Sequence, residues 1–460
     1  MNLRTYQKSD AEFLIQKPFT ACFNEQRTGK TPTALETIRL RGLIDDKILI
    51  VTTSSSLYQW QREYNTWLDR PCEVCDGTPA KKRKAVENWT HGLVVSLDSF
   101  KETKTRKGLM EDILPKQPKM VILDEAHKIK NTTSANAKAM FKTNKIPYRL
   151  ALTGTPAQGK SYDIFAILKF LYPETFNSLW KFLEYFYIIE DKKIWVKTKN
   201  GPKEKIIKEH EIFQPGKEEE LQDYLSTIAT QRKRKDVMDW LPDKFYEKVQ
   251  LEPTKEQKKY LKELEEVYRT GDLVTKGTLD RFIRYRQICL DPKMLGLPSK
   301  SPKTEWIKQY IKDNPDEQIL IFSKFTSYLK MLSTEIDTKW AMLIGATPAK
   351  TRAKFCEDFQ AKKFQVFLIN IDAGKEAITL DAAETTIFTD KYPPIGSIEQ
   401  AEDRFIASTE EKAHKAHKIV ELMMSGTYDE VVYELLAQRK SETDIINNFN
   451  KYIERRQENE

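Results

Sequence analysis

The sequence lacks the features that mark membrane, secreted and linker-rich proteins. It has no run of about 18 apolar residues, so no membrane-spanning helix is expected. The first ten residues, MNLRTYQKSD, contain no apolar segment of the kind that a signal peptide needs. Five cysteines in 460 residues are too few for a disulfide framework, and a reduced, intracellular setting is expected. Glycine is scarce, with 16 residues against a usual share of about 7%, which excludes long glycine-rich linkers.

Charge is present in excess and is unevenly distributed. The chain has 76 Lys and Arg against 68 Asp and Glu, a formal net charge of +8. Residues 191–210 contain seven lysines and three acidic residues, and residues 81–84 and 232–235 are basic throughout. Such clusters are typical of a protein that binds a polyanion, and a solvated surface gives the same pattern. Charge alone leaves both interpretations open.

Apolar runs alternate with helical patterns in two parts of the chain. The expected strands of the first part are Lys47–Thr53, Gly92–Leu97, Lys119–His127 and Tyr148–Thr155. Those of the second part are Glu317–Ser323, Trp340–Gly345, Phe364–Asn370 and Thr385–Asp390. Continuous apolar strands that alternate with helices predict parallel sheets covered on both faces.

The stretch between these two parts, from about residue 172 to 290, is basic and aromatic and has mainly helical patterns. We therefore expect an α/β fold with two parallel-sheet lobes and helical insertions between them. The predicted division is residues 1–175, 176–300, 301–440 and a polar tail at 441–460, which we expect to be a short helix or a frayed end.

The segment NEQRTGKT (Asn24–Thr31) has the ending of a phosphate-binding loop and precedes a helical pattern. Backbone N–H groups at a helix N-terminus can hold phosphate oxygens. Lys30 would reach the outer phosphates, and the Thr31 hydroxyl would bind Mg²⁺. The usual first glycine of the pattern is replaced by Asn24, so the motif alone is weak.

Two carboxylates strengthen this interpretation. VILDEAHK (Val121–Lys128) places Asp124 and Glu125 at the carboxyl end of an expected strand, where open α/β sheets bind ligands. Asp124 can hold Mg²⁺ through its water shell, and Glu125 can orient and polarise the attacking water. The third motif, LTGTP (Leu152–Pro156), follows in the same order.

In this order the motifs resemble those of superfamily-two helicase-type ATPases, specifically the Swi/Snf type that moves on double-stranded DNA. The resemblance extends over essentially the whole chain. The matching segments are Leu3–Gln7, Ile50–Trp67, Asp124–Asn131, Leu152–Gly159, Asp163–Pro173, Gln231–Lys244, Phe282–Leu295, Leu320–Leu329, Val366–Gly374 and Gln400–Arg404. The lean chain is more similar to phage and bacterial members than to eukaryotic remodelling enzymes.

The resemblance implies two RecA-like lobes that bind ATP and Mg²⁺. It implies nucleotide contacts at Gln7, Asn24, Thr28, Gly29, Lys30, Thr31 and Asp124, with Mg²⁺ at Thr31 and Asp124. It implies coupling roles for His127, Thr153, Gly154, Thr155 and Gln400, and DNA contacts at Thr52, Thr53, Ser54, Ser323, Lys324 and Lys375. Catalysis would fall to Lys30, Glu125 and the arginine finger Arg404. The implied partners are double-stranded or branched DNA, no membrane, and candidate replication or recombination proteins, in the cytoplasm of a bacterial or phage-infected cell.

Departures from the family pattern keep alternatives open. Lys375 and Glu376 stand where the family has small residues, and Ala407 stands where it has a second arginine. Translocation on duplex DNA is the main hypothesis, and strand separation or branch migration is the second. A clamp that binds ATP and DNA without hydrolysis is a third.

Overall fold

The computed structural model of the chain describes residues 3–100, 108–157, 160–198, 201–209, 212–238, 240, 244–267, 269–270, 273–275, 277–374, 380–391, 398, 402, 417–438, 440 and 442–458. Contacts between residues divide the chain into two compact units, Met1–Asp239 and Trp240–Glu460. Each unit is described by itself. The finer four-part division of the sequence stays a prediction.

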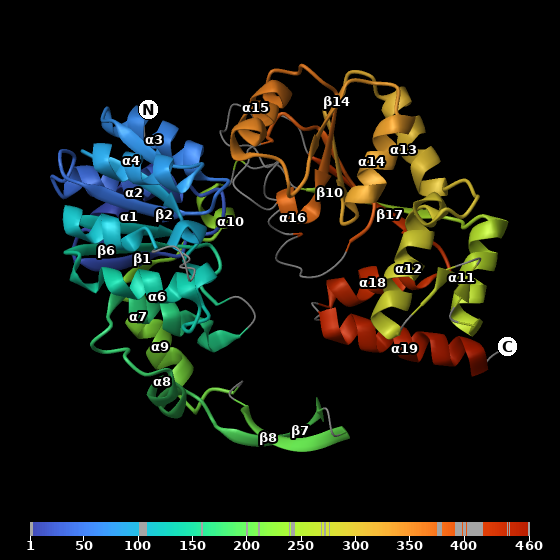
Figure 1. Cartoon of the computed structure of the whole chain (residues 1–460), viewed down its shortest axis with the longest axis horizontal. Helices are drawn as coiled ribbons and strands as arrows, with labels where there is room; N and C mark the ends of the chain where they lie inside the picture. The colour runs from blue at the N-terminus through green and yellow to red at the C-terminus, as the bar shows by residue number, and fades with distance from the viewer. Residues whose placement is uncertain are drawn as a thin grey trace. The chain divides into compact units, whose positions relative to one another are not determined.

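A seven-stranded parallel sheet forms the centre of the first unit, and Figure 1 labels its strands β1, β2 and β6. The strand order is β3-β4-β2-β5-β6-β1-β9. Its strands are β1 (Phe19–Cys22), β2 (Ile48–Thr52), β3 (Cys72–Cys75), β4 (Gly92–Ser96), β5 (Met120–Asp124), β6 (Tyr148–Leu152) and β9 (Ala229–Thr230). The four strands expected from the sequence are confirmed. The shorter β1 and β9 were not expected.

The first unit has the following helices among its described residues, and several of them cover both faces of the sheet. They are α1 (Thr5–Leu14), α2 (Lys30–Leu40), α3 (Leu57–Leu68), α4 (Pro79–Asn88), α5 (Met110–Ile113), α6 (Ala135–Phe141), α7 (Phe165–Leu171), α8 (Leu179–Phe186), α9 (Lys217–Ser226) and α10 (Arg234–Val237). Alternate residues of one strand enter different cores: Ile50 packs with Trp60 of α3, and Val51 packs with Phe165 of α7. The continuous apolar character of β2 follows, because both of its faces are buried.

The expectation of a mainly helical insertion is wrong for part of the region. The lysine-rich segment forms two antiparallel strands, β7 (Glu190–Thr198) and β8 (Gly201–Glu209). Later in the sequence of this region, β9 joins the first sheet beside β1. The next strand, β10 (Phe245–Leu251), joins the second sheet beside β17 (Lys418–Met424). The region thus completes the edges of both sheets instead of forming a separate helical layer.

The second unit contains a six-stranded parallel sheet in the order β10-β17-β16-β13-β15-β14. The remaining strands are β13 (Ile319–Ser323), β14 (Trp340–Leu343), β15 (Val366–Asn370) and β16 (Thr385–Phe388), and a short pair is formed by β11 (Arg269–Thr270) and β12 (Leu273–Val274). The four strands expected in this part are confirmed, and with the first sheet they confirm the α/β class with two parallel-sheet lobes.

The helices of the second unit include a long C-terminal one. They are α11 (Lys255–Val267), α12 (Thr278–Leu290), α13 (Pro302–Asp313), α14 (Thr326–Glu335), α15 (Ala349–Gln360), α16 (Ile371–Gly374), α18 (Tyr428–Ala437) and α19 (Glu442–Glu458). The expected polar tail is α19, and Ile445, Phe449 and Ile453 pack in the core with Phe282 of α12. The helical alternative is therefore confirmed, but the helix is neither short nor frayed, because an apolar stripe at helical spacing anchors it.

Among the helices that the structure describes, none combines the length and the apolar character that crossing a lipid bilayer requires.

Candidate functional site: a nucleotide site in the first unit

The phosphate loop leads from β1 into the N-terminus of α2. Gly29, the last residue before α2, has φ +81°, in the left-handed region that glycine adopts without strain. A Cβ atom at Gly29 would lie 2.0 Å from Gln7 Nε2, so the close approach also requires glycine. Lys30 Nζ donates hydrogen bonds to Asn24 O at 2.9 Å and Glu25 O at 3.1 Å. The loop therefore curls around the lysine at the positive end of a helix.

Helix α1 packs directly against this loop. Gln7 Nε2 donates to Thr28 O at 3.1 Å, and the Tyr6 hydroxyl donates to the same oxygen at 2.8 Å. Gln7 Oε1 accepts from the N–H of Arg4 at 2.9 Å. The structure thus brings together Gln7 and Thr28, two residues predicted to bind the nucleotide, while their contacts with the nucleotide stay predictions.

Asp124 lies at the end of β5 and accepts three hydrogen bonds. Its Oδ2 accepts from Thr52 Oγ1 at 2.8 Å and from Trp60 Nε1 at 2.9 Å, and its Oδ1 accepts from the N–H of Glu125 at 3.0 Å. Burial, followed by the charge of Glu125, raises the pKa of Asp124. The contact of Trp60 with Asp124 was not predicted, although Trp60 lies within the matched segment Ile50–Trp67.

Glu125, His127 and Thr153 form a polar chain. Glu125 Oε2 lies 3.3 Å from His127 Nδ1, which lies 3.0 Å from Thr153 Oγ1. Thr153 Oγ1 also accepts from the N–H of Thr155 at 3.1 Å. Burial, and then the charge of Lys128, lowers the pKa of His127 to about 4, so this histidine is neutral at pH 7. The three predicted coupling and catalytic positions are thus in direct contact.

The ends of four strands meet at this site. Thr153 N–H donates to Cys22 O at 3.1 Å, which links the end of β6 to the end of β1. A Cβ atom at Gly154 would lie 3.2 Å from Gln26 N, so the LTGT motif touches the phosphate loop. With the Thr52–Asp124 bond, the carboxyl ends of β2, β5, β6 and β1 meet at one place, which is where parallel sheets bind ligands.

The residues around the loop fit a nucleotide with its metal ion. Lys30 and the N-terminus of α2 offer positive potential, and Thr31 and Asp124 offer the hard oxygen donors that Mg²⁺ prefers. Among the described residues, the buried oxygens Asn24 Oδ1, Gln26 Oε1 and Thr155 Oγ1 have no hydrogen-bond partner. Such atoms need donors, which water molecules around a magnesium ion can supply.

The predicted DNA contacts of the first unit do not all reach the surface. Thr52 is fully buried against Asp124. Thr53 is only 8% exposed, and its Oγ1 lies 2.8 Å from Ser56 Oγ. Ser54 is exposed. A side-chain contact with DNA is therefore compatible with Ser54 and disagrees with the placement of Thr52.

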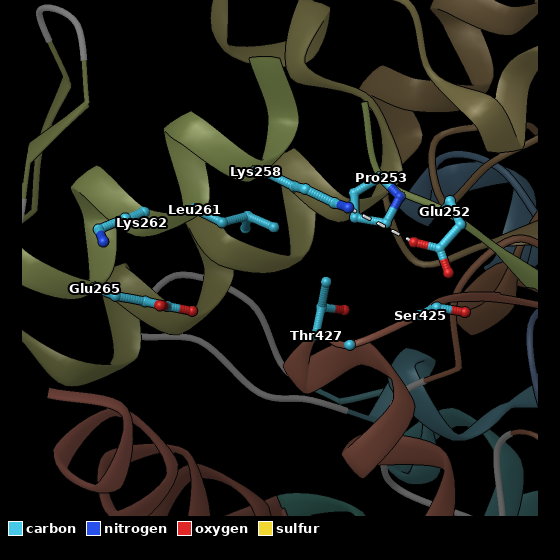
Figure 2. A pocket seen from close by; sticks show the side chains of 9 residues that line it. Glu252, Pro253, Lys258, Leu261, Lys262, Glu265, Ser425 and Thr427 are labelled. Carbon is cyan, nitrogen blue, oxygen red and sulfur yellow. Dashed lines mark ion pairs between the residues drawn. The ribbon is translucent and has the colours of Figure 1, made fainter. Parts of the chain in front are cut away.

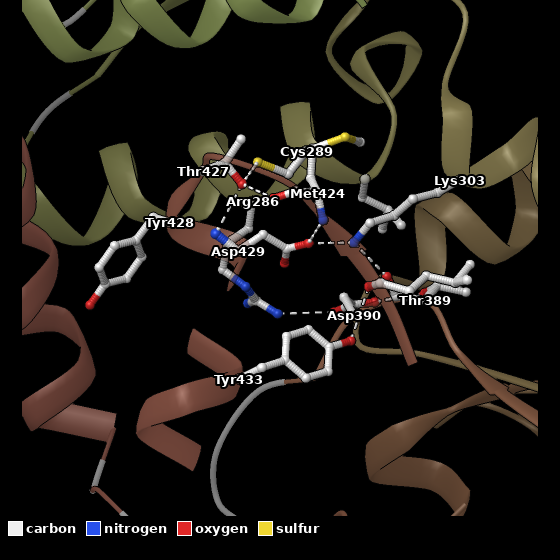
Figure 3. A network of polar contacts seen from close by, with 12 residues as sticks. Arg286, Cys289, Lys303, Thr389, Asp390, Met424, Thr427, Tyr428, Asp429 and Tyr433 are labelled. Atoms are coloured by element: carbon white, nitrogen blue, oxygen red, sulfur yellow. Dashed lines mark hydrogen bonds and ion pairs between the residues drawn. The ribbon is translucent and has the colours of Figure 1, made fainter. Parts of the chain in front are cut away.

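In the second unit, Ser323 is also buried. Its hydroxyl donates to Asp390 Oδ1 at 2.6 Å, and Asp390 Oδ2 accepts from Arg286 at 2.9 Å. Lys303 Nζ donates to Thr389 O at 2.9 Å in the same network (Figure 3). Lys324, by contrast, is partly exposed, and its Nζ lies 2.6 Å from Asp372. The placement of Lys324 is thus compatible with a DNA contact, whereas the Ser323 side chain is buried and hydrogen-bonded to Asp390.

Four further positions, Lys375, Gln400, Arg404 and Ala407, lie outside the described residues, so their roles stay predictions. Glu402, between Gln400 and Arg404, is described and buried. It accepts from Lys391 at 3.1 Å, from Lys244 at 3.2 Å and from the Tyr246 hydroxyl at 2.8 Å. Burial alone would raise the pKa of Glu402, but the two lysines outweigh it and hold that pKa below its ordinary value.

A cavity of about 390 Å³ lies elsewhere in the second unit (Figure 2). It is lined by α11 and by the turn from β17 into α18, including Leu261, Lys262 and Thr427. Charges of both signs face it, with Lys258 Nζ 3.7 Å from Glu252. None of the predicted site residues lines this cavity, and its mixed charge selects no ligand class.

Comparisons with known proteins find two matching families. Residues 7–294 match the SNF2-related domain, and residues 302–406 match the helicase conserved C-terminal domain. The chain is 25% identical over 474 residues to "Probable ATP-dependent DNA helicase CHR12" of Arabidopsis thaliana, a match that covers 95% of this chain and 41% of that protein.

A human relative, "SWI/SNF-related matrix-associated actin-dependent regulator of chromatin subfamily A member 1", is 25% identical over 404 residues. That match covers 80% of this chain and 36% of the relative, so the chain spans about two fifths of the length of such relatives. A solved structure, "Sulfolobus solfataricus SWI2/SNF2 ATPase core in complex with dsDNA", is 22% identical with a TM-score of 0.43. It matches over 95% of this chain and 91% of that one.

Proposed function

The chain belongs to the SNF2-related family of superfamily-two, Swi/Snf-type ATPases, and from this membership we propose that it uses ATP hydrolysis to move along duplex DNA. As a member of this family the chain is an ATP hydrolase. Movement on DNA, the preferred DNA structure and the cellular process are our proposals.

The observation that carries the proposal is the meeting of four strand ends in the first unit. Lys30, Asp124, Glu125 and the His127–Thr153 pair all lie at or directly after these ends. Polar contacts link Asp124, Glu125, His127 and Thr153 in turn, while Lys30 donates to backbone carbonyls of the phosphate loop. A purely structural polar cluster would not need a lysine at a helix N-terminus together with two carboxylates. ATP hydrolysis needs a cation for the phosphates, a carboxylate for the metal ion and a carboxylate that orients water.

The residues divide the work of hydrolysis. When bound, ATP with Mg²⁺ supplies the phosphoryl group and the ion that offsets its charge. Lys30 would bind the outer phosphates, while Thr31 and Asp124 would hold the metal ion and its water. Glu125 would orient the attacking water and accept its proton. His127, which contacts both Glu125 and Thr153, would couple these two residues.

The DNA contacts proposed for this chain are sequence-independent. Phosphate contacts carry no base information, and they weaken as salt rises. Ser54, Lys324 and the lysines of the β7–β8 pair are the candidate contacts, with Lys375 as a further one. Membership of the SNF2-related family favours duplex over single-stranded DNA as the partner. Replication or recombination proteins as partners, and a bacterial or phage-infected cell as the setting, remain parts of the proposal.

Steady-state ATP hydrolysis measured without DNA and with single-stranded, duplex and branched DNA tests the proposal. We expect duplex DNA to stimulate turnover most, and Lys30→Ala to abolish it. Displacement of a third strand from a triplex then tests movement, and release of a strand from a forked duplex tests strand separation. Absence of turnover with every DNA, despite ATP binding, would favour the non-hydrolysing clamp.

A further inference from the structure

The first half of the phosphate loop is hydrogen-bonded to the segment that follows β9. The N–H groups of Phe23 and Glu25 donate to the carbonyls of Thr230 and Arg232, at 2.8 and 2.9 Å. This two-residue spacing continues the parallel ladder between β1 and β9 into the loop. The backbone path of residues 23–25 is therefore set by a segment about 200 residues away in the sequence.

A buried carboxylate joins the same two segments. Asp10 of α1 is 0% exposed, and its Oδ2 accepts from Asn24 Nδ2 at 2.7 Å. Its Oδ1 accepts from Arg232 Nε at 3.0 Å and Nη2 at 2.8 Å. A carboxylate buried this deeply needs such donors in place of the water that it has lost. Asp10 thus ties α1, the loop and the basic segment to one point.

Lys30 is connected to this point through the loop backbone. Its Nζ donates to the carbonyls of Asn24 and Glu25. Asn24 is fixed by its side chain to Asp10, and the Glu25 carboxylate accepts from the N–H of Arg234 at 2.7 Å. Both carbonyls that receive the lysine are therefore fixed from outside the loop.

We propose that Asp10 and Arg232 are positioning residues for the nucleotide: they hold the loop in its binding conformation without touching the nucleotide. The proposal rests on the function proposed above and adds a regulatory consequence to it. Arg232 begins the segment that leads out of the first unit, whose last residue is Asp239. Displacement of this segment would release the loop and lower the affinity for nucleotide.

The test measures equilibrium binding of a fluorescent ATP analogue, the KM and kcat for ATP, and the affinity for duplex DNA. The variants are Asp10→Asn, Arg232→Gln and the pair together. The matched control is Lys233→Gln, because Lys233 is an exposed neighbour and loses the same charge. We expect each single change to weaken nucleotide binding and raise KM about tenfold, within the range for coupled contacts. Duplex DNA affinity should change less than about twofold.

Two comparisons separate positioning from stability alone. The affinity of the double variant for nucleotide should be no lower than that of the single variant with the lower affinity. Both changes break the same contact, between Asp10 and Arg232. Arg232→Lys, which keeps the charge, should recover part of the affinity. Arg232 is 40% exposed at its side chain, so its variants keep the test valid if Asp10→Asn fails to fold.

The outcomes are distinguishable from failure of the proposed function. If Lys30→Ala loses nucleotide while Asp10→Asn and Arg232→Gln bind it normally, the positioning role is refuted and the ATP site stands. An equal loss in Lys233→Gln would also refute it, because charge rather than contact would be responsible. If Lys30→Ala itself binds nucleotide normally, the assignment of the ATP site is wrong.

Discussion

Glu125 has a backbone conformation that few residues other than glycine adopt. Its φ of 49° and ψ of 48° lie in the left-handed region, directly after β5. Such a conformation costs about 1–3 kcal/mol and is retained mainly where the side chain must point in a particular direction. Here it turns the Glu125 carboxylate toward His127. The strain supports a catalytic role for the residue.

Replacement of Glu125 by glutamine should separate binding from hydrolysis. Glu125→Gln keeps a hydrogen-bonding side chain of the same size but loses the oxygen that accepts a proton. We expect ATP and DNA to bind as before, while hydrolysis falls about 10²-fold or more, the usual effect of losing a general base. Single-turnover hydrolysis and nucleotide binding measure the two effects. Simultaneous loss of ATP binding would instead make Glu125 a structural or metal-binding residue.

His127 should make the first unit sensitive to acid. Its folded pKa of about 4 lies below the ordinary value of about 6.5, so the unfolded chain binds a proton that the folded chain excludes. The neutral His127 therefore adds to the free energy of unfolding fully above about pH 6.5, and this stabilisation is lost as pH falls toward 4. Between pH 6.5 and 5 it amounts to about 2 kcal/mol. Denaturant unfolding of wild type and His127→Asn across this range should give a shallower pH dependence for the variant; parallel curves would contradict the assignment.

At the level of single residues, the sequence predicted which types meet at the site but not where each hydroxyl points. Lys30, Asp124, Glu125, His127 and Thr153 lie together as their motifs indicate. The side chain of Thr52 was expected to face DNA and instead hydrogen-bonds to Asp124. Motif spacing places a residue at a strand end, whereas the direction of its side chain depends on the facing helix.

Among the elements, the buried parallel strands were the most predictable. Their continuous apolar runs reflect burial on both faces, and the structure places β2, β4, β5 and β6 within the expected ranges. The β7–β8 pair was missed because lysine is unfavourable in strands and hides the pattern. The partners of β9 and β10 are far away in sequence, which local pattern cannot reveal.

The basic clusters show the same limit. Within RKRK at residues 232–235, Arg232 is bound to the buried Asp10 and is thus partly a structural cation. Within residues 81–84, Lys82 donates to Ser99 and Arg83 pairs with Asp112 at 3.1 Å. A count of charges cannot tell such internal partners from free surface, so each cluster needs its own test.

The lysines of the β7–β8 pair should contribute to DNA binding. They are Lys192, Lys193, Lys197, Lys203, Lys205 and Lys208; Lys199, predicted with them, lies outside the described residues. Neutralising several should weaken binding uniformly across DNA sequences, because phosphates carry no base information. The slope of log affinity against log salt should fall by about 0.9 for each lost contact.

A matched control for this measurement removes similar charge elsewhere on the first unit. Lys81→Gln with Lys84→Gln changes two exposed lysines of α4. These changes should alter the salt slope less than two changes within β7 and β8. An unchanged slope in the β7–β8 variants would leave their lysines as a solubilising surface.

At the scale of the whole molecule, each unit contributes a different half of the predicted ATPase. The first contains the phosphate loop and both carboxylates, and the second contains the segment before Arg404. Glu402 fixes that segment to Lys391, which follows β16, and to Lys244 and Tyr246 at the start of the unit. Glu402 is thus a fixed point of the second unit, and Arg404 follows it by two positions in the sequence.

Arg404→Ala tests whether the second unit takes part in hydrolysis. Charge that builds on the transferred phosphoryl group needs a cation to offset it, and Arg404 is the arginine that matches the family position. Because Ala407 cannot donate a side-chain hydrogen bond, either Arg404 acts alone or a nearby cation such as Lys375 assists. We expect Arg404→Ala to bind ATP and DNA nearly normally and to lose DNA-stimulated hydrolysis roughly 10³-fold.

Lys375→Ala is the comparison variant. A loss of hydrolysis in Lys375→Ala as well would show that Lys375 assists, and no loss would make Arg404 sufficient. Hydrolysis by Arg404→Ala at the wild-type rate would mean that the second unit supplies no finger, and a cation from a partner would have to take its place.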